Sequence, residues 1–212
     1  LGYDRFVAQG GDWGSAVSSA IGASGDAAVA GIHVNMIVAP PTPDDMADPT
    51  LEEQAALAAF QRYMTDGNGY AQQQATRPQT LGYALVDSPA GQAAWIFEKF
   101  HAWTNCDGDP LNVLTLDEII DNIMLYWLPG TAASAARLYW ESFRDFAAAR
   151  VEVPVACSLF PKEILRASRR WAERRYPHIV HWGEPARGGH FAAFEQPELF
   201  VEEVRAGFRP MR

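Results

Sequence analysis

An aspartate set among glycines near residue 10 is the side chain best suited to chemistry. The sequence Gly10-Gly-Asp-Trp-Gly14 follows a short apolar run at residues 5–9 and precedes small residues at 15–22. This pattern predicts a strand, a tight turn and a helix. The glycines let the turn hold Asp12 above the sheet in a strained conformation. A carboxylate nucleophile attacks an sp³ carbon and becomes an ester, which predicts epoxides or alkyl halides as substrates.

The Gly-x-nucleophile-x-Gly spacing is that of the nucleophile elbow of the α/β-hydrolase fold, with aspartate where serine is usual. Hydrolysis of an aspartyl ester needs a base that activates water, and histidine is the usual one near neutral pH. The chain has five histidines: His33, His101, His178, His181 and His190. His190 follows two glycines after the last predicted strand, where this fold places its histidine. We therefore predict His190 as the base, against the alternative of a loop residue that caps the last helix.

A carboxylate partner is needed to orient the histidine and to stabilise its charged form. The fold supplies this acid from a loop after a preceding strand. Glu163 follows the predicted strand at residues 153–160 and is the preferred candidate. Asp87 and Glu184 are competitors, and Glu163 could instead be a surface carboxylate near a helix start.

Epoxide opening also needs an acid that protonates the leaving oxygen, and a tyrosine hydroxyl can serve. The central part of the chain holds five tyrosines: Tyr63, Tyr70, Tyr83, Tyr126 and Tyr139. Periodicity does not choose among them, because an aromatic residue on a helix is more often part of a core.

Composition restricts the class of protein. The chain has 212 residues, 48% hydrophobic and 20% charged, which suits one globular domain with an inserted subdomain. A net charge of −9 argues against binding nucleic acid. Cys106 and Cys157 have no metal-binding or redox spacing, and there is no apolar run long enough for a membrane segment. These features favour a cytoplasmic setting.

The order of elements predicts an α/β fold. Strands are expected at residues 5–9, 31–38, 153–160 and 178–182, and their alternation with helices predicts a parallel sheet. Helices are expected at residues 15–22, 51–65, 89–103, 116–128, 131–149, 168–176 and 197–208. We therefore expect sheet segments at 1–42 and 151–212, with an inserted helical lid at 43–150.

Several segments together resemble epoxide hydrolases of the α/β-hydrolase superfamily, in the branch of the microsomal and juvenile-hormone enzymes and their bacterial relatives. The resemblance runs through the chain in family order. Its segments are residues 9–14 (QGGDWG), 31–36 (GIHVNM), 69–80 (GYAQQQATRPQT), 87–91 (DSPAG), 98–100 (EKF), 124–127 (MLYW), 160–163 (FPKE) and 187–194 (RGGHFAAF).

The resemblance implies a role for each matching residue. It implies Asp12 as nucleophile, His190 as general base and Glu163 as charge-relay acid. It also implies Tyr70 and Tyr139 as the ring-opening proton donors, and the Trp13 backbone N–H as an oxyanion donor. The resemblance implies that the substrate is a small apolar epoxide, that water is the second reactant, and that no metal or organic cofactor is needed. It is also compatible with a homo-oligomer.

The chain starts at Leu1, and the family's His-Gly-Trp-Pro motif, which precedes the elbow, is absent. We therefore expect the C-terminal part of an α/β-hydrolase fold without its N-terminal strands, and little activity or solubility for these 212 residues alone. Two alternatives stay open: a haloalkane dehalogenase-like hydrolase, and a truncated product without activity. Halide release and the DNA upstream of Leu1 would distinguish them.

Overall fold

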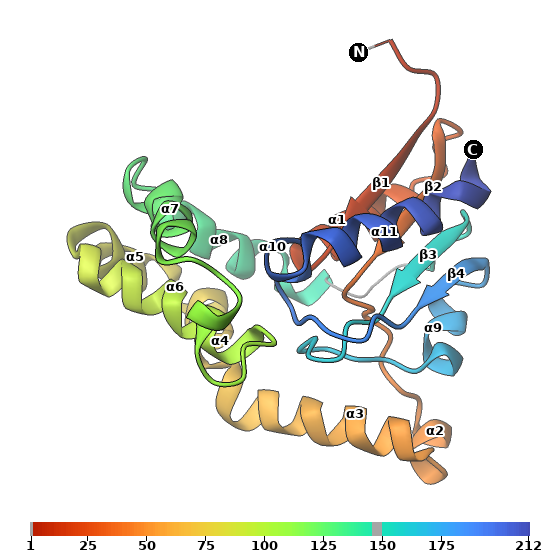
Figure 1. Cartoon of the computed structure of the whole chain (residues 1–212), viewed down its shortest axis with the longest axis horizontal. Helices are drawn as coiled ribbons and strands as arrows, with labels where there is room; N and C mark the ends of the chain where they lie inside the picture. The colour runs from red at the N-terminus through yellow and green to blue at the C-terminus, as the bar shows by residue number, and fades with distance from the viewer. Residues whose placement is uncertain (1, 146–149) are drawn as a thin grey trace. The chain divides into compact units, whose positions relative to one another are not determined.

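Figure 1 shows the computed structural model of the chain, which describes residues 2–145 and 150–212. It consists of two compact units. One combines Leu1–Gln61 with Ala147–Arg212 and contains the sheet, and the other is Arg62–Phe146 and is helical. The helical unit is therefore inserted into the chain of the sheet unit, as the sequence predicts.

Four parallel strands form the sheet. They are β1 (Phe6–Gly10), β2 (Val29–Val34), β3 (Val155–Ser158) and β4 (Ile179–Gly183), in the spatial order β1-β2-β3-β4. The predicted strands and their parallel arrangement are confirmed. Among the described residues β1 pairs only with β2, and its Phe6 and Val7 are 43% and 37% exposed. Strand β1, which leads into the elbow, is therefore an edge of the described sheet.

Helices cover both faces of this sheet. Side chains alternate along each strand, so neighbouring residues of β2 face opposite ways. Ile32 packs toward Gly22 of α1 (Trp13–Ala23), whereas His33 packs toward Gly207 of α11 (Pro197–Phe208). The Ile32 face joins a buried cluster that includes Trp171 of α9 (Arg169–Arg175). Burial on both faces explains the continuous apolar runs in β2 and β3.

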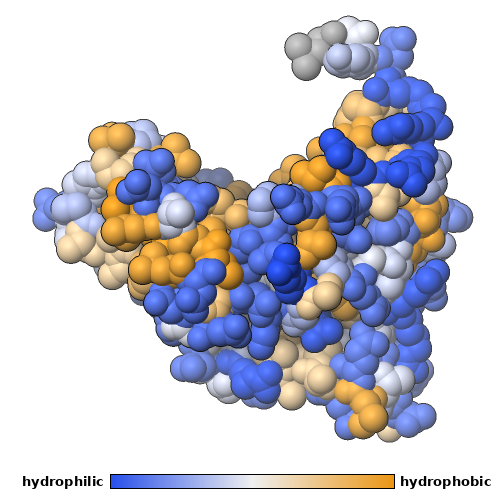
Figure 2. Space-filling view, in the orientation of Figure 1, coloured by the Kyte–Doolittle hydropathy of each residue, from blue (hydrophilic) through white to orange (hydrophobic). Residues whose placement is uncertain are grey.

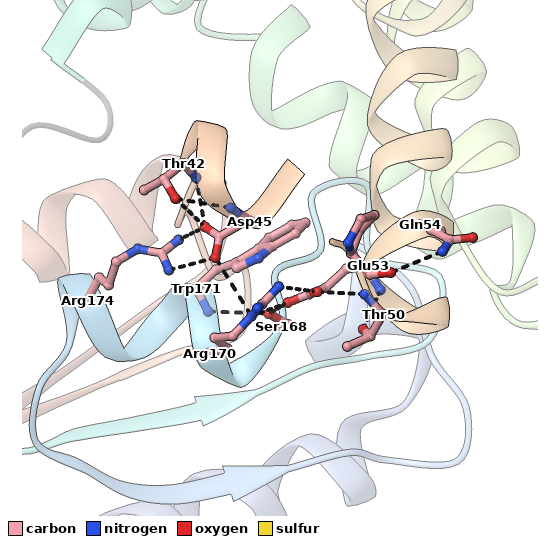
Figure 3. Close-up of polar contacts among 10 residues, drawn as sticks. Thr42, Asp45, Thr50, Glu53, Gln54, Ser168, Arg170, Trp171 and Arg174 are labelled. Atoms are coloured by element: carbon pink, nitrogen blue, oxygen red, sulfur yellow. Dashed lines mark hydrogen bonds and ion pairs between the residues drawn. The ribbon is translucent and has the colours of Figure 1, made fainter. Parts of the chain in front are cut away.

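The first two helices after β2 belong to the sheet unit, although we expected residues 43–61 in the lid. These helices are α2 (Pro43–Ala47) and the long α3 (Leu51–Arg62). Figure 3 shows how they are attached to α9: Arg174 binds the Asp45 carboxylate, and Arg170 binds Glu53. The helical unit accordingly begins near Arg62, not at residue 43.

Glu53 is the centre of this contact. It is 1% exposed and accepts hydrogen bonds from Ser168 Oγ at 2.7 Å and from Arg170 Nη2 at 2.6 Å (Figure 3). The backbone N–H of Thr50 donates to the same carboxylate at 2.9 Å. Burial alone would raise the pKa of Glu53, but these hydrogen bonds lower it to about 2. The buried carboxylate is therefore charged and fully engaged at neutral pH.

The helical unit follows α3 through a five-residue π-helix, Tyr63–Gly67. Its helices are α4 (Gly69–Thr76), α5 (Pro78–Asp87), α6 (Pro89–Trp103), α7 (Leu116–Trp127) and α8 (Ala132–Ser142). The helix predicted at 89–103 is observed as α6 with the same bounds. Thr115 caps α7 in a capping box with Glu118. Gly82 of α5 lies against Ala133 of α8, which lets these two helices pack closely.

Some boundaries differ from those expected. One helix was expected at residues 131–149, but the structure has α8 followed by the 3₁₀ turn Phe143–Asp145. Residues 146–149 of the expected helix lie outside the described part. Helices α4 and α5 were not anticipated. The remaining short helices are α10 (Ala192–Glu195) and the 3₁₀ turns Pro110–Asn112 and Arg209–Met211.

Hydrophobic side chains reach the surface of the helical unit, where Figure 2 shows orange groups at the left of the view. Examples are Leu125, which is 70% exposed, Leu128, which is 74% exposed, and Tyr83, which is 68% exposed. Within the described residues, no helix has the length and apolar character that crossing a membrane requires.

Candidate active site

The turn after β1 has the geometry of a strained elbow. Strand β1 ends at Gly10 and α1 begins at Trp13, so Asp12 stands between them with φ 48° and ψ −128°. A positive φ is uncommon for a residue with a side chain and indicates stored strain. A Cβ atom at Gly10 would overlap the Gly14 carbonyl oxygen, so the turn requires glycine there. The sequence prediction of a glycine-dependent turn at this position is in accord with this geometry.

Two hydrogen bonds, one of them buried, hold this turn against the segment after β2. Ser15 Oγ donates to the Met36 carbonyl at 2.6 Å, and Gln9 Nε2 donates to Asn35 Oδ1 at 2.9 Å. Asn35 also lies against Gly11, where a side chain would collide with its amide. The backbone around Asp12 is therefore fixed from both sides, which supports the strained conformation.

His190 lies between two carboxylates. Its Nδ1 donates to Glu163 Oε1 at 2.7 Å, and its Nε2 is 3.8 Å from Asp12 Oδ2. The side chains of His190 and Glu163 are 3% and 0% exposed, whereas Asp12 is 42% exposed. The structure therefore brings together the three residues that the sequence analysis selected for this part of the site.

The loops that carry Glu163 and His190 are joined through their backbones. Lys162 N–H donates to the Gly188 carbonyl at 3.1 Å, and Lys162 and Gly189 form a parallel bridge. Gly189 N–H donates to the buried Glu195 carboxylate at 2.9 Å. Sequence reasoning missed Glu195, although a carboxylate within the apolar stretch after His190 is a signal of a buried polar contact.

Opposing effects set the pKa of His190. Burial would lower it, but the negative charges of Glu163 and Asp12 raise it to about 10. The imidazole is consequently cationic at neutral pH. A change that removes the charge of Asp12 lowers the pKa of His190.

Glu184 and Asp87, the other two candidates for the acid that orients the histidine, lie in different surroundings from Glu163. Glu184 Oε1 accepts a hydrogen bond from Trp182 Nε1 at 2.7 Å, and Asp87 ends α5 in the helical unit. Neither makes the contact with His190 Nδ1 that Glu163 makes. This difference favours Glu163 over both.

Two of the other histidines join a second polar network on the α11 side of the sheet. His33 Nε2 lies 3.0 Å from Ser158 Oγ, which donates to Glu203 Oε2 at 2.7 Å. His181 Nε2 contacts the same carboxylate oxygen at 2.9 Å. Burial lowers the pKa of His33 to about 4, so this side chain is neutral. The network binds β2, β3 and β4 to α11.

The tyrosines of the helical unit form a separate group. Tyr70 on α4 and Tyr139 on α8 have ring centroids 5.7 Å apart at 77°. The hydroxyl of Tyr63, in the π-helix, lies 3.2 Å from that of Tyr70. The sequence could not choose among the lid tyrosines on periodicity, and Tyr63 was not selected. A π-helix, which often marks a functional site, is not visible in the sequence.

The surroundings of Tyr70 suppress its ionisation. Burial, with the neighbouring hydroxyls of Tyr139 and Tyr63, raises the pKa of Tyr70 above its ordinary value. The hydroxyl thus keeps its proton in the resting protein and is available as a hydrogen-bond donor.

No arrangement of three or more histidine, cysteine, aspartate or glutamate side chains in residues 2–145 and 150–212 could hold a metal ion. Cys106 and Cys157 are buried and free, and burial raises the pKa of the Cys157 thiol to about 12.

The chain contains part of an α/β-hydrolase fold: a parallel sheet, an elbow after β1 and a helical insertion between β2 and β3. Among solved structures it is similar to juvenile hormone epoxide hydrolase from the silkworm Bombyx mori, with a TM-score of 0.90 and 32% identity, covering 100% of this chain and 56% of that one. The epoxide hydrolase of Aspergillus niger gives a TM-score of 0.87 and 30% identity, over 100% and 54% of the two chains.

The curated relatives are epoxide hydrolases. A putative epoxide hydrolase of Stigmatella aurantiaca (strain DW4/3-1) is 53% identical, over 100% of this chain and 48% of the relative. Epoxide hydrolase 1 of Sus scrofa is 35% identical, over 97% and 51%. No family model matches the sequence. The chain is thus a homologue of epoxide hydrolases and spans about half the length of the curated relatives it matches.

Proposed function

We propose that the protein hydrolyses an epoxide to a vicinal diol through a covalent ester on Asp12. The observation that carries this proposal is the placement of His190 between Glu163 and the carboxylate at the elbow. A carboxylate in that position forms an ester, and an adjacent histidine with its own acid can direct water to hydrolyse it. The similarity to epoxide hydrolases supports the same reaction.

In the first step, an Asp12 carboxylate oxygen attacks a ring carbon of the epoxide. The carbon–oxygen bond of the ring breaks, and the leaving oxygen takes a proton from Tyr70 or Tyr139. This step moves a negative charge from Asp12 to the tyrosine oxygen. It leaves a neutral ester and the first hydroxyl of the diol.

In the second step, His190 accepts a proton from water, which attacks the ester carbonyl. Esterification has removed the negative charge of Asp12, so one of the two charges that raise the pKa of His190 is gone. The imidazole can then release its proton to solvent, and the tyrosine phenolate regains one from solvent, so that His190 is a base when the ester exists. Glu163 stabilises the imidazolium that re-forms. When the tetrahedral intermediate collapses, the ester bond between the Asp12 carbonyl carbon and the substrate oxygen breaks. The leaving oxygen takes a proton from the imidazolium and becomes the second hydroxyl of the diol, and the Asp12 carboxyl proton passes to His190.

The tetrahedral intermediate carries a negative oxygen that needs hydrogen-bond donors. Trp13 is the first residue of α1, an eleven-residue helix, so its backbone N–H lies at the end where amides and the helix dipole favour negative charge. We assign this N–H to the oxyanion hole. The reaction as written requires no metal and no organic cofactor, and its substrate is a small apolar epoxide.

The tyrosine group favours an epoxide over an alkyl halide. Halide departure needs donors such as indole N–H groups and no proton transfer, whereas an epoxide oxygen must be protonated. Tyr70 keeps its proton and lies beside Tyr63 and Tyr139, which suits proton donation.

The test compares the protein expressed from its complete open reading frame with the variants Asp12→Asn and Glu184→Gln. Styrene oxide and 1-chlorohexane are the two substrates. The proposal predicts that styrene oxide gives the diol and that 1-chlorohexane releases no chloride. Asp12→Asn should lose about a thousandfold or more in kcat/KM for styrene oxide when it is first mixed with the substrate. Glu184→Gln should remain active. Chloride release without diol, or full activity of Asp12→Asn, would contradict the proposal.

A further inference from the structure

A largely buried lysine in the helical unit lies against the ring of Tyr70. The Lys99 ammonium on α6 is 4.4 Å from the centroid of the Tyr70 ring and 5.2 Å from that of Trp103. The Tyr70 and Trp103 rings meet edge to face, with centroids 5.2 Å apart. Lys99 belongs to the segment Glu98-Lys-Phe100. The mechanism proposed above assigns no role to this segment.

The position of Lys99 is unusual for a surface helix residue. Its side chain is only 12% exposed, and its acidic partner is Glu98, 2.9 Å away and 63% exposed. Burial of an ammonium is unfavourable unless other groups compensate it. The faces of two aromatic rings provide part of this compensation, because a ring face carries partial negative charge.

Ring opening places a full negative charge at the same location. The Tyr70 proton goes to the epoxide oxygen, and the electron pair of its O–H bond stays on the tyrosine, which becomes a phenolate. A buried phenolate without a counter-charge would make this proton transfer unfavourable. The contact between Lys99 and Tyr70 then changes from a cation over a neutral ring to an attraction between opposite charges.

We propose that Lys99 is a positioning residue for ring opening, whose ammonium stabilises the negative charge that develops on Tyr70 as it protonates the epoxide. This inference rests on the proposed function, because it assumes that Tyr70 is a proton donor. Lys99 does not touch the reacting atoms and acts through Tyr70. Its effect is confined to the first step, since the phenolate is formed there.

The test measures the two steps separately in single turnovers of styrene oxide, using the protein from its complete open reading frame. Lys99→Met keeps the length of the side chain without its charge, and Lys99→Arg keeps the charge. We expect Lys99→Met to slow formation of the Asp12 ester about tenfold and to leave ester hydrolysis within about twofold. Lys99→Arg should remain within about threefold of the unsubstituted protein.

A chemical rescue separates the charge effect from a structural one. Replacement of Tyr70 by 3-fluorotyrosine gives a more acidic phenol of nearly the same shape. We expect it to raise the ester-formation rate of Lys99→Met by a larger factor than that of the protein that keeps Lys99. Lys99→Gln replaces Lys99→Met if the latter does not fold. If neither neutral variant folds, Lys99 is a structural residue and the proposal is overturned.

The outcomes distinguish the two proposals. If the unsubstituted protein forms no Asp12 ester, the proposed function fails. If it forms the ester and Lys99→Met forms it equally fast, the inference about Lys99 alone fails. Equal slowing of both steps, or no rescue by 3-fluorotyrosine, would also overturn it.

Discussion

The Nε2 atom of His190 lies 3.8 Å from Asp12 Oδ2, so the charge of the Asp12 carboxylate acts directly on the His190 imidazole. Before reaction this contact favours the imidazolium. In the mechanism we propose, esterification removes this charge, and the same imidazole becomes ready to accept a proton. One distance thus links the order of the two chemical steps to the protonation of His190.

The charge of Asp12 should be measurable in the titration of His190. In Asp12→Asn the pKa of His190 should fall below its value of about 10, because one of the two carboxylates that raise it has become neutral. Titration of ¹⁵N-labelled imidazoles by NMR checks this. Glu163→Gln serves as a second variant and should also lower the pKa of His190. An unchanged pKa in Asp12→Asn would show that the two side chains are not coupled.

The elbow should tolerate a methyl group at one glycine and not at another. Gly10→Ala places a Cβ against the Gly14 backbone and should reduce the free energy of unfolding by about 2 kcal/mol or more. Gly14→Ala is the matched control, because apart from chain neighbours and the backbone of its own helix no atom lies within 4 Å of the added Cβ. Alanine in place of glycine in a helix gains up to about 1 kcal/mol. Urea unfolding of both variants gives the comparison. Equal stabilities would contradict the close approach at Gly10.

The contact between α3 and α9 should make stability dependent on acid. The pKa of Glu53 is lowered from 4.5 to about 2, so its contribution is present above pH 4.5 and is lost as the pH falls toward 2. Glu53→Gln should lower the melting temperature at pH 7 and flatten its decline below pH 4.5. The exposed neighbour Glu52 offers the control Glu52→Gln, which should melt like the unsubstituted protein across this range. A steep acid decline that persists in Glu53→Gln would assign the pH dependence to other carboxylates.

Tyr63 should assist ring opening through its hydroxyl. Its oxygen lies 3.2 Å from that of Tyr70, and a hydrogen bond to a phenolate is stronger than one to a neutral phenol. Tyr63→Phe should therefore slow Asp12 ester formation about tenfold, with ester hydrolysis little affected. Tyr83→Phe is the control, since that residue is 68% exposed. If stopped-flow traces of Tyr63→Phe match those of the control, the Tyr63 hydroxyl has no part in the step.

The elbow and its histidine could be predicted because local sequence carries the signal. Glycines at fixed spacing report the strained backbone at Asp12, and the chain order of the fold places His190 and Glu163. The strands could be predicted for a similar reason, since burial on both faces leaves continuous apolar runs.

Contacts between distant residues left no such signal. Glu53 and Arg170 are separated by 117 positions, and nothing in either local sequence pairs them, so the attachment of α3 to the sheet unit was missed. Tyr63 could not be selected because its contact with the Tyr70 hydroxyl depends on a π-helix and on the position of Tyr70. The choice of Tyr70 and Tyr139 likewise came from the resemblance to epoxide hydrolases and not from periodicity.

The central claim is the ester on Asp12, and a single turnover in water labelled with ¹⁸O tests it most directly. The protein is used in excess over styrene oxide, and both the diol and the peptide that contains Asp12 are analysed by mass spectrometry. We predict that the first diol contains no ¹⁸O and that the label enters the Asp12 carboxylate, because water attacks the ester carbonyl. Label in the first diol, with an unlabelled Asp12, would contradict the covalent mechanism.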